Sequence, residues 1–235
     1  SETSVLPFVS YQTNNPSGPI KKMEATHDNS YFYLNVETSL PLVKGDTIIV
    51  AFDTYLQSTG ESRLPNGRSL QNRSEFILRA VAGSDTALFQ VTEAYDMKGF
   101  TPRFNLSDPL KQKYRSVFST GAPWKTVEWI NDQFMMTSQF PGLMPMENRN
   151  DFSAGKRTAL AWSGSVMRIR IPWTFLNFYD PTRMQVINGA VSYDGGYNFE
   201  IQPLLSDGIA VSVYNKGIVT SSTTRYTWKS WLTVP

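Results

Sequence analysis

The sequence of 235 residues contains no cysteine. This absence excludes disulfides, thiolate zinc sites, iron–sulfur clusters and cysteine nucleophiles. Histidine is almost absent as well, because His27 is the only one. A histidine-rich metal site is therefore excluded, and a Ser-His-Asp triad would have to use this residue.

An excess of charge of one sign is also lacking. The chain has 22 Lys and Arg against 20 Asp and Glu, which gives a net charge of +2. A nucleic-acid binder usually carries a basic stripe, so we do not expect nucleic acid as a partner. No apolar run approaches the roughly 18 residues that a membrane-spanning helix needs. Phosphate loops and dinucleotide fingerprints are missing too.

Aromatic residues are plentiful, with 14 Phe, 11 Tyr and 6 Trp. Aromatic side chains favour β-structure. Alternating apolar residues and short β-branched runs, bounded by turn residues, predict many short strands. These cover residues 20–26, 31–36, 47–53, 74–81, 87–93, 166–171, 197–201 and 209–214. Consecutive strands separated by short turns predict three hairpins: 20–26 with 31–36, 74–81 with 87–93, and 197–201 with 209–214.

Helix is scarce in the sequence. Residues 125–136 carry Val127, Ile130 and Phe134 at roughly helical spacing, and Pro172 could begin a second short helix. The sequence thus predicts an all-β, antiparallel, jelly-roll-like β-sandwich with one or two short helices. We expect one domain over residues 1–235, with an insertion or elaborated loop region at 98–160.

Five segments, taken in order, resemble a known family. They are KMEATHDNSYFYL at 22–34, IIVAFDT at 48–54, SEF at 74–76, MRIRIPW at 167–173 and YTWKSW at 226–231. Together they resemble family 9 carbohydrate-binding modules and the related DOMON-like domains, although Arg168 and Arg170 stand where that family more often has an acidic residue. The resemblance implies a β-sandwich and often carbohydrate binding, as an appendage of a larger secreted or surface glycan-active protein.

Sugar binding requires aromatic ring faces beside planar hydrogen-bonding groups, because the electron-rich face of a ring suits the C–H groups of a pyranose. We expect Trp124 and Trp129 to form the stacking platform. Three residues after the strand at 47–53 would line its edge, and two tyrosines bracket the turn at 194–196. These further candidates are Tyr55, Arg63, Asn66, Tyr193 and Tyr197. Core packing competes with ligand contact for every one of these rings, and we expect Trp173 to be structural.

Metal and haem sites are weaker hypotheses. Carbohydrate-binding sandwiches often hold a structural calcium ion; Asp28, Asp194 and Asp207 could contribute ligands, although turn chemistry explains the same residues. Some DOMON-like relatives bind haem, which would need His27 together with a methionine. We expect His27 at the exposed tip of a turn, which disfavours haem.

The sequence thus favours a non-catalytic, extracellular or cell-surface module whose partners are a carbohydrate and neighbouring domains. Two alternatives stay open. One is a structural or dimerisation module that binds no sugar, because exposed aromatic residues and edge strands serve that role too. The other is a glycan-active enzyme with an unrecognised carboxylate pair. The pair would lie in the long middle of the chain. Two of the acids on or beside the predicted strands could also meet in space: Glu24, Glu37, Asp53, Glu75, Glu93 and Glu200.

Overall fold

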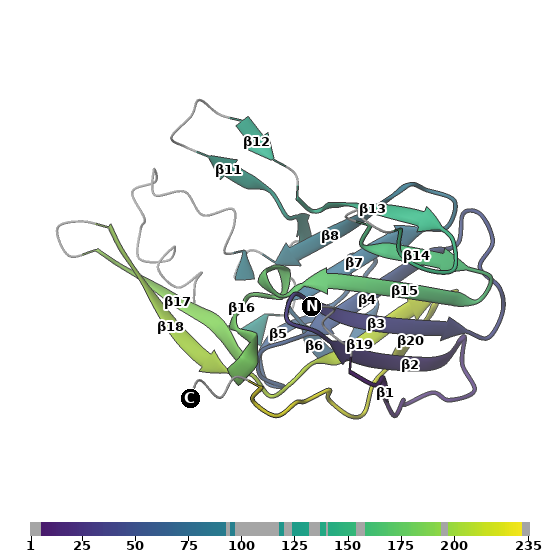
Figure 1. Cartoon of the computed structure of the whole chain (residues 1–235), viewed down its shortest axis with the longest axis horizontal. Helices are drawn as coiled ribbons and strands as arrows, with labels where there is room; N and C mark the ends of the chain where they lie inside the picture. The colour runs from purple at the N-terminus through teal and green to yellow at the C-terminus, as the bar shows by residue number, and fades with distance from the viewer. Residues whose placement is uncertain are drawn as a thin grey trace.

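Strand pairing organises nearly the whole described chain (Figure 1). The computed structural model describes residues 6–92, 95–96, 118–119, 124–131, 137–139, 141–153, 158–193 and 197–231. The strands are β1 (Val9–Ser10), β2 (Ile20–His27), β3 (Tyr31–Thr38), β4 (Thr47–Asp53), β5 (Gly60–Arg63), β6 (Ser69–Ser74), β7 (Phe76–Val81), β8 (Thr86–Thr92), β9 (Phe118–Ser119), β10 (Trp124–Thr126), β11 (Trp129–Asn131), β12 (Thr137–Gln139), β13 (Leu143–Asn148), β14 (Leu160–Ser163), β15 (Val166–Pro172), β16 (Phe178–Asp180), β17 (Gln185–Tyr193), β18 (Tyr197–Leu205), β19 (Ala210–Asn215) and β20 (Ile218–Ser221). Two short 3-10 helices are η4 (Trp173–Leu176) and η5 (Pro181–Arg183).

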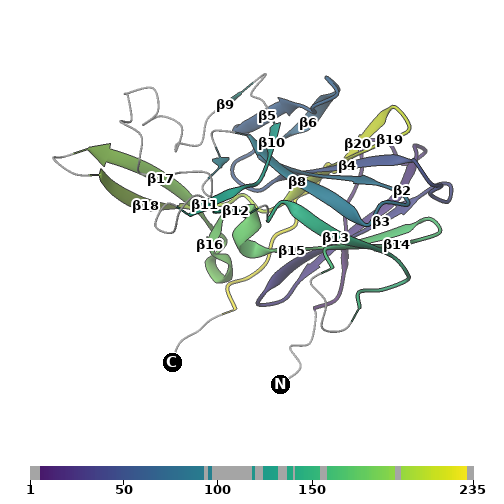
Figure 2. The same cartoon turned by 90° about the horizontal axis from the view of Figure 1, so that it is seen from above.

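One curled sheet of 12 strands forms the body, in the order β1-β2-β3-β15-β14-β13-β8-β7-β4-β19-β20, with β10 paired to β8. Its curl lays β2, β3 and β15 over β8, β7 and β4 in two layers (Figure 2). Rings meet between the layers, for example Phe32 of β3 and Phe52 of β4 at 6.3 Å between centroids. The predicted all-β sandwich is confirmed.

Side-chain alternation explains how each layer covers the core. On β3 every second residue is fully buried, and the residues between are half-buried on the outer face; β15 shows the same pattern. By contrast, β4 is buried on both faces. Its outward residues Ile49 and Ala51 pack with Leu64, Leu70 and Ile77 in a second, smaller apolar cluster. The predictions of alternating strands and of a doubly buried 47–53 strand are confirmed.

Two predicted hairpins are present, β2–β3 and β7–β8. The third is wrong, because β18 pairs with β17 while β19 pairs with β4 and β20. No strand was predicted over 185–193, so the true partner of β18 was missing. The helix over 125–136 is wrong as well, since β10 and β11 occupy its first half; residues 132–136 lie outside the described part. The short helix after Pro172 is confirmed as η4.

The strand β13 joins the two layers. Leu143, Met144 and Pro145 pair with β8 of one layer, whereas Met146 to Asn148 pair in parallel with β14 of the other. β14 is short and pairs with β15 only up to Ile169. Beyond that point, β15 runs on to Pro172 with no strand between it and the first half of β13. This interruption opens a groove, described below.

Glycine 208 allows a close approach of two backbone segments. Gly208 and Gly45 have nearly the same backbone conformation, with φ of +97° and +95°. A Cβ atom at Gly208 would lie 2.6 Å from the carbonyl oxygen of Tyr226, whereas one at Gly45 would meet nothing within 4 Å. We expect Gly45→Ala to cost about 1–3 kcal/mol of unfolding free energy through backbone strain alone, and Gly208→Ala to cost clearly more. Urea unfolding of both variants tests this, and equal losses would contradict it.

Candidate binding site

Trp124 and Arg63, two of the predicted site residues, lie together. The Trp124 Nε1 donates a hydrogen bond of 2.9 Å to the Arg63 carbonyl. The half-buried indole, however, packs against the apolar cluster that contains Ile49 and Ile77. Asn66 is exposed, and its Oδ1 accepts from the backbone N–H of Arg68 within a turn. Trp124 therefore covers a small core with part of its ring surface, and no described pocket adjoins it.

Tyr55 is wrong as a site residue, because its side chain is only 2% exposed. Its hydroxyl donates to the Ile187 carbonyl at 2.6 Å and accepts from the Asn177 Nδ2 at 3.0 Å. The chain turns inward directly after β4, which places the ring in the interior. The buried Trp173, 3% exposed, confirms the structural role expected for it.

The side chains of Trp129, Tyr193 and Tyr197 lie outside the described residues. Their backbones are placed: Trp129 pairs with Gln139 in β11–β12, and Tyr193 pairs with Tyr197 at the end of the β17–β18 hairpin. Their predicted contacts with a sugar stay predictions.

His27 is not at an exposed turn tip, as was expected, but is 3% exposed. β2 includes His27, and the tight turn comes one residue later, where the Asp28 N–H donates to the Tyr31 carbonyl. Its ring stacks on Trp231 at 4.5 Å between centroids and contacts three more rings. These belong to Trp173, Tyr226 and Trp228. The C-terminal segment thus folds back over the end of β2, which local turn signals do not reveal.

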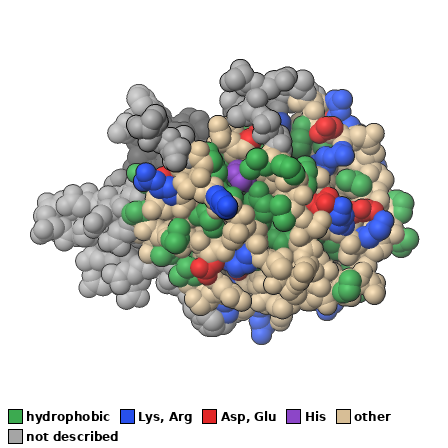
Figure 3. Space-filling view, turned by 60° about the horizontal axis from the view of Figure 1, so that its bottom comes forward, with side chains coloured by type: hydrophobic (Ala, Val, Ile, Leu, Met, Phe, Trp, Pro, Cys, Tyr) green, Lys and Arg blue, Asp and Glu red, His purple; other side chains and the backbone are tan. Residues whose placement is uncertain are grey.

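A pocket of about 290 Å³ adjoins this cluster of rings. Its lining residues are Leu6, His27, Asp28, Asn29, Trp228, Lys229 and Trp231, and we call it the tryptophan pocket. The Trp228 indole is fixed by a hydrogen bond of 2.7 Å from its Nε1 to the Pro181 carbonyl. Figure 3 shows this face, with the histidine in purple and hydrophobic side chains in green beside it.

The hydrogen bonding of His27 leaves one polar atom for a ligand. Its Nδ1 lies 2.7 Å from the Tyr226 hydroxyl. That hydroxyl also has a side-chain hydrogen bond with Thr26, and we assign Tyr226 as the donor to Nδ1. Nε2 then carries the ring hydrogen, and no described residue accepts it. Burial lowers the pKa of His27 to about 4, against a smaller opposing effect of Asp28, so the ring is neutral at pH 7.

Asp28 serves the turn. Its Oδ1 accepts from the backbone N–H groups of Ser30 and Tyr31, each at 2.7 Å, and its Oδ2 accepts from the Tyr33 hydroxyl at 2.7 Å. Asp207 accepts from the Gln57 N–H at 3.1 Å, and Asp194 lies outside the described residues. Within the described ranges, no group of three or more His, Asp or Glu side chains is placed to hold a metal ion. The calcium site stays a prediction.

A second, larger groove of about 650 Å³ opens between β13 and β15, at the interruption left by β14. We call it the β13–β15 groove. It is lined by Tyr31, Pro141, Leu143, Met144, Pro145, Thr158, Ala159, Arg170, Pro172, Thr174 and Phe175. The Arg170 guanidinium carbon lies 5.4 Å from the ring centroid of Tyr31 and 4.5 Å from that of Phe152. Its Nε donates to the Thr158 carbonyl at 2.6 Å.

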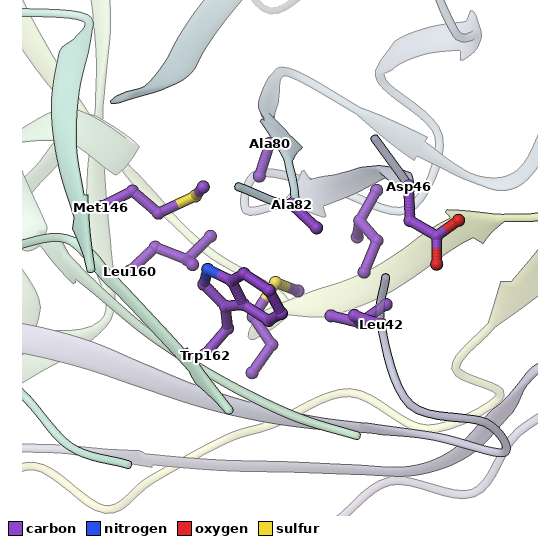
Figure 4. A pocket seen from close by; sticks show the side chains of 9 residues that line it. Leu42, Asp46, Ala80, Ala82, Met146, Leu160 and Trp162 are labelled. Carbon is purple, nitrogen blue, oxygen red and sulfur yellow. The ribbon is translucent and has the colours of Figure 1, made fainter. Parts of the chain in front are cut away.

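A third cavity, of only about 10 Å³, lies in the core and has room for about one water molecule. Figure 4 shows Met146, Leu160 and Trp162 on one side of it and Ala80 and Ala82 on the other. The buried Trp162 Nε1 has no hydrogen-bond partner in the described part of the chain. The size of this cavity rules out a sugar.

Two of the acids considered for a carboxylate pair, Asp53 and Glu75, are fully buried close to each other. Asp53 receives two hydrogen bonds from Arg225, of 2.6 and 2.9 Å. Glu75 Oε2 accepts from the Thr54 N–H at 2.8 Å, while its Oε1 has no partner among the described residues. Neither acid lines any of the three pockets.

Burial raises the pKa of both acids. For Glu75 the rise is large, with burial as the main cause and the neighbouring Asp53 as the next. For Asp53 burial raises the pKa to about 6, against the opposing effect of Arg225. Glu75 is therefore the member of the pair that keeps its proton more readily, and the hydrogen bonds from Arg225 favour the ionised form of Asp53.

The residues of the tryptophan pocket that sequence reasoning missed are Trp228, Trp231 and His27. The two tryptophans were noted only as part of the segment at 226–231. Two Trp residues three apart, in a segment without strand periodicity, were the available signal. The surface they form depends on a contact with β2, about 200 positions earlier, and no local pattern contains that contact.

Comparisons with protein-family models, with curated proteins and with solved structures find no match to this chain. The resemblance to family 9 carbohydrate-binding modules therefore stays a prediction from the quoted segments. Among the described residues, no helix is long and apolar enough to cross a membrane.

The raised pKa of Glu75 predicts a pH dependence of stability. Between pH 6 and 8 the unfolded chain has this side chain ionised, while burial in the folded chain favours its protonated form. The folded state then binds more protons, so its contribution to stability falls as pH rises, by up to about 1.4 kcal/mol per pH unit. We expect Glu75→Gln to remove this slope.

Urea unfolding at pH 6, 7 and 8 gives the free energy of unfolding of wild type and Glu75→Gln. The effect of Glu75 is the difference between the two at each pH, because both proteins contain His27 and its contribution cancels. Glu37→Gln, on the outer face of β3, is the control. Identical slopes in wild type and Glu75→Gln would show that Glu75 is ionised in the folded protein.

Proposed function

We propose that this chain is a non-catalytic carbohydrate-binding module and that a sugar binds in the tryptophan pocket. The observation that carries the proposal is the meeting of two half-buried indoles, Trp228 and Trp231, with an uncommitted His27 N–H beside them. Flat apolar faces combined with a few placed polar groups are the features that sugar recognition needs.

Each group has a role in the proposed complex. The exposed faces of Trp228 and Trp231 stack on the C–H face of a pyranose. The His27 Nε2–H donates to a ring or hydroxyl oxygen of the sugar. Asn29 and Lys229, both exposed, supply further donors at the rim. The volume of about 290 Å³ lies at the lower end of small-molecule sites and suits a single sugar residue.

The chemistry of the pocket supports binding without bond cleavage. Asp28, the only carboxylate among the described lining residues, already accepts three hydrogen bonds within its turn. A glycosidase needs two carboxylates on either side of the scissile bond, and the buried neighbours Asp53 and Glu75 adjoin none of the three pockets described above. Together with the resemblance, this favours a module of a larger secreted or surface glycan-active protein.

The test is a glycan array followed by calorimetric titration of the best ligand, with and without calcium. We expect Trp231→Ala to weaken binding at least tenfold, because it removes one stacking face, while circular dichroism stays unchanged. Trp124→Ala is the matched control, since Trp124 is one of the two tryptophans that the sequence analysis predicted to form the stacking platform, and its side chain is described.

The two variants separate the competing sites. If Trp124→Ala abolishes binding and Trp231→Ala does not, the sugar site lies at β10 and the tryptophan pocket is the wrong choice. If no glycan binds the folded wild-type chain, the proposed function fails and a packing module without sugar binding becomes the better account.

A further inference from the structure

The tryptophan pocket and the β13–β15 groove lie on either side of one tight turn. Asp28 and Asn29 line the pocket, while Tyr31 lines the groove. The turn is closed by a hydrogen bond of 3.0 Å from the Asp28 N–H to the Tyr31 carbonyl. The Cα atoms at the two ends of such a turn are about 7 Å apart or less. The two hollows are therefore neighbours on the surface.

We propose that the pocket and the groove are two subsites of a single site for an oligosaccharide, which crosses the turn at residues 28–31. This inference rests on the proposed function. One sugar residue lies against Trp228 and Trp231, and the chain continues over the turn along the Tyr31 ring into the groove.

The lining of the groove fits further sugar residues. Tyr31 and Phe175 offer aromatic surface, and Thr174 and Arg170 place a hydroxyl and a guanidinium group among apolar walls. Stacking between two rings holds the Arg170 side chain in place, which lowers the entropy cost of binding. With more than twice the volume of the pocket, the groove has room for more than one residue.

The turn between the subsites is held rigidly. The Asp28 carboxylate accepts from two backbone N–H groups and from the Tyr33 hydroxyl. On its other side, the Trp173 Nε1 donates to the Asp28 carbonyl at 2.9 Å. A ligand that crosses the turn therefore meets a surface that is already ordered.

An extended peptide suits the groove less well than a saccharide. A strand added between β13 and β15 would need backbone donors from both edges. Pro145 on β13 and Pro172 on β15 have no N–H group, and proline is a common means of preventing strand addition. The ring faces of Tyr31 and Phe175, which a saccharide can stack on, do not depend on backbone donors.

The experiment measures affinity against chain length. The glycan that binds best on the array is cut into a ladder of one, two, four and six residues; for a β-1,4-glucan these are glucose, cellobiose, cellotetraose and cellohexaose. Each is titrated by calorimetry into wild type, Tyr31→Ala, Leu143→Arg, Trp231→Ala and Tyr179→Ala. Leu143 is 49% exposed in the groove, so an arginine there fills the groove without a change in the core, and Tyr179, 56% exposed, is the aromatic control.

We expect wild-type affinity to rise about tenfold or more between one and four residues. Tyr31→Ala and Leu143→Arg should abolish this rise while leaving affinity for the single sugar within twofold. Trp231→Ala should weaken every ligand, and Tyr179→Ala none.

Equal wild-type affinity along the ladder would overturn the two-subsite proposal and leave the proposed function intact. A length dependence that survives both groove variants would overturn it as well. Absence of any glycan binding to wild type would instead be a failure of the proposed function.

Discussion

The ion pair between Asp53 and Arg225 fixes the C-terminal segment to the sandwich. Asp53 is fully buried at the end of β4, and Arg225 meets it with two hydrogen bonds of 2.6 and 2.9 Å. A third hydrogen bond, to the Gly208 carbonyl, holds the guanidinium in place. A buried pair of this kind is costly to desolvate, and loss of one partner costs about 3–5 kcal/mol. Tyr226, Trp228 and Trp231 follow Arg225 directly, so the position of the aromatic cluster on β2 depends on this contact.

The sequence predicted the sandwich wherever local periodicity sets the strand. Residues 31–36 and 166–171 alternate clearly, and in the structure they pair with each other across β3 and β15. The doubly buried run at 47–53 was equally plain. The partner of β18 was missed because residues 185–193 mix polar, glycine and apolar residues without a clear period. The apolar residues at β10 and β11 have a spacing that also fits a helix, but these segments form strands because they pair with other strands.

The site was less predictable than the fold. Trp124 and Arg63 do lie together. The sequence around a tryptophan near a loop, however, does not show whether one face of its ring packs against a core. Tyr55 and His27 were both predicted to be exposed, and both are buried. In each case a local change of direction was missed: the chain turns inward after Asp53, and the hairpin turn begins after His27. Burial of these residues is set by segments more than 100 positions away, and those contacts leave no trace in short motifs.

The tryptophan pocket joins two segments that lie about 200 positions apart in the sequence. His27 is the last residue of β2, whereas Trp228 and Trp231 follow β20. During translation, His27 is made long before Trp228 and Trp231. Its contacts with these rings can form only after nearly the whole sandwich has been synthesised and Arg225 has paired with Asp53. The cluster of rings around His27 is therefore a property of the folded sandwich, and a partly synthesised or misfolded chain does not present it.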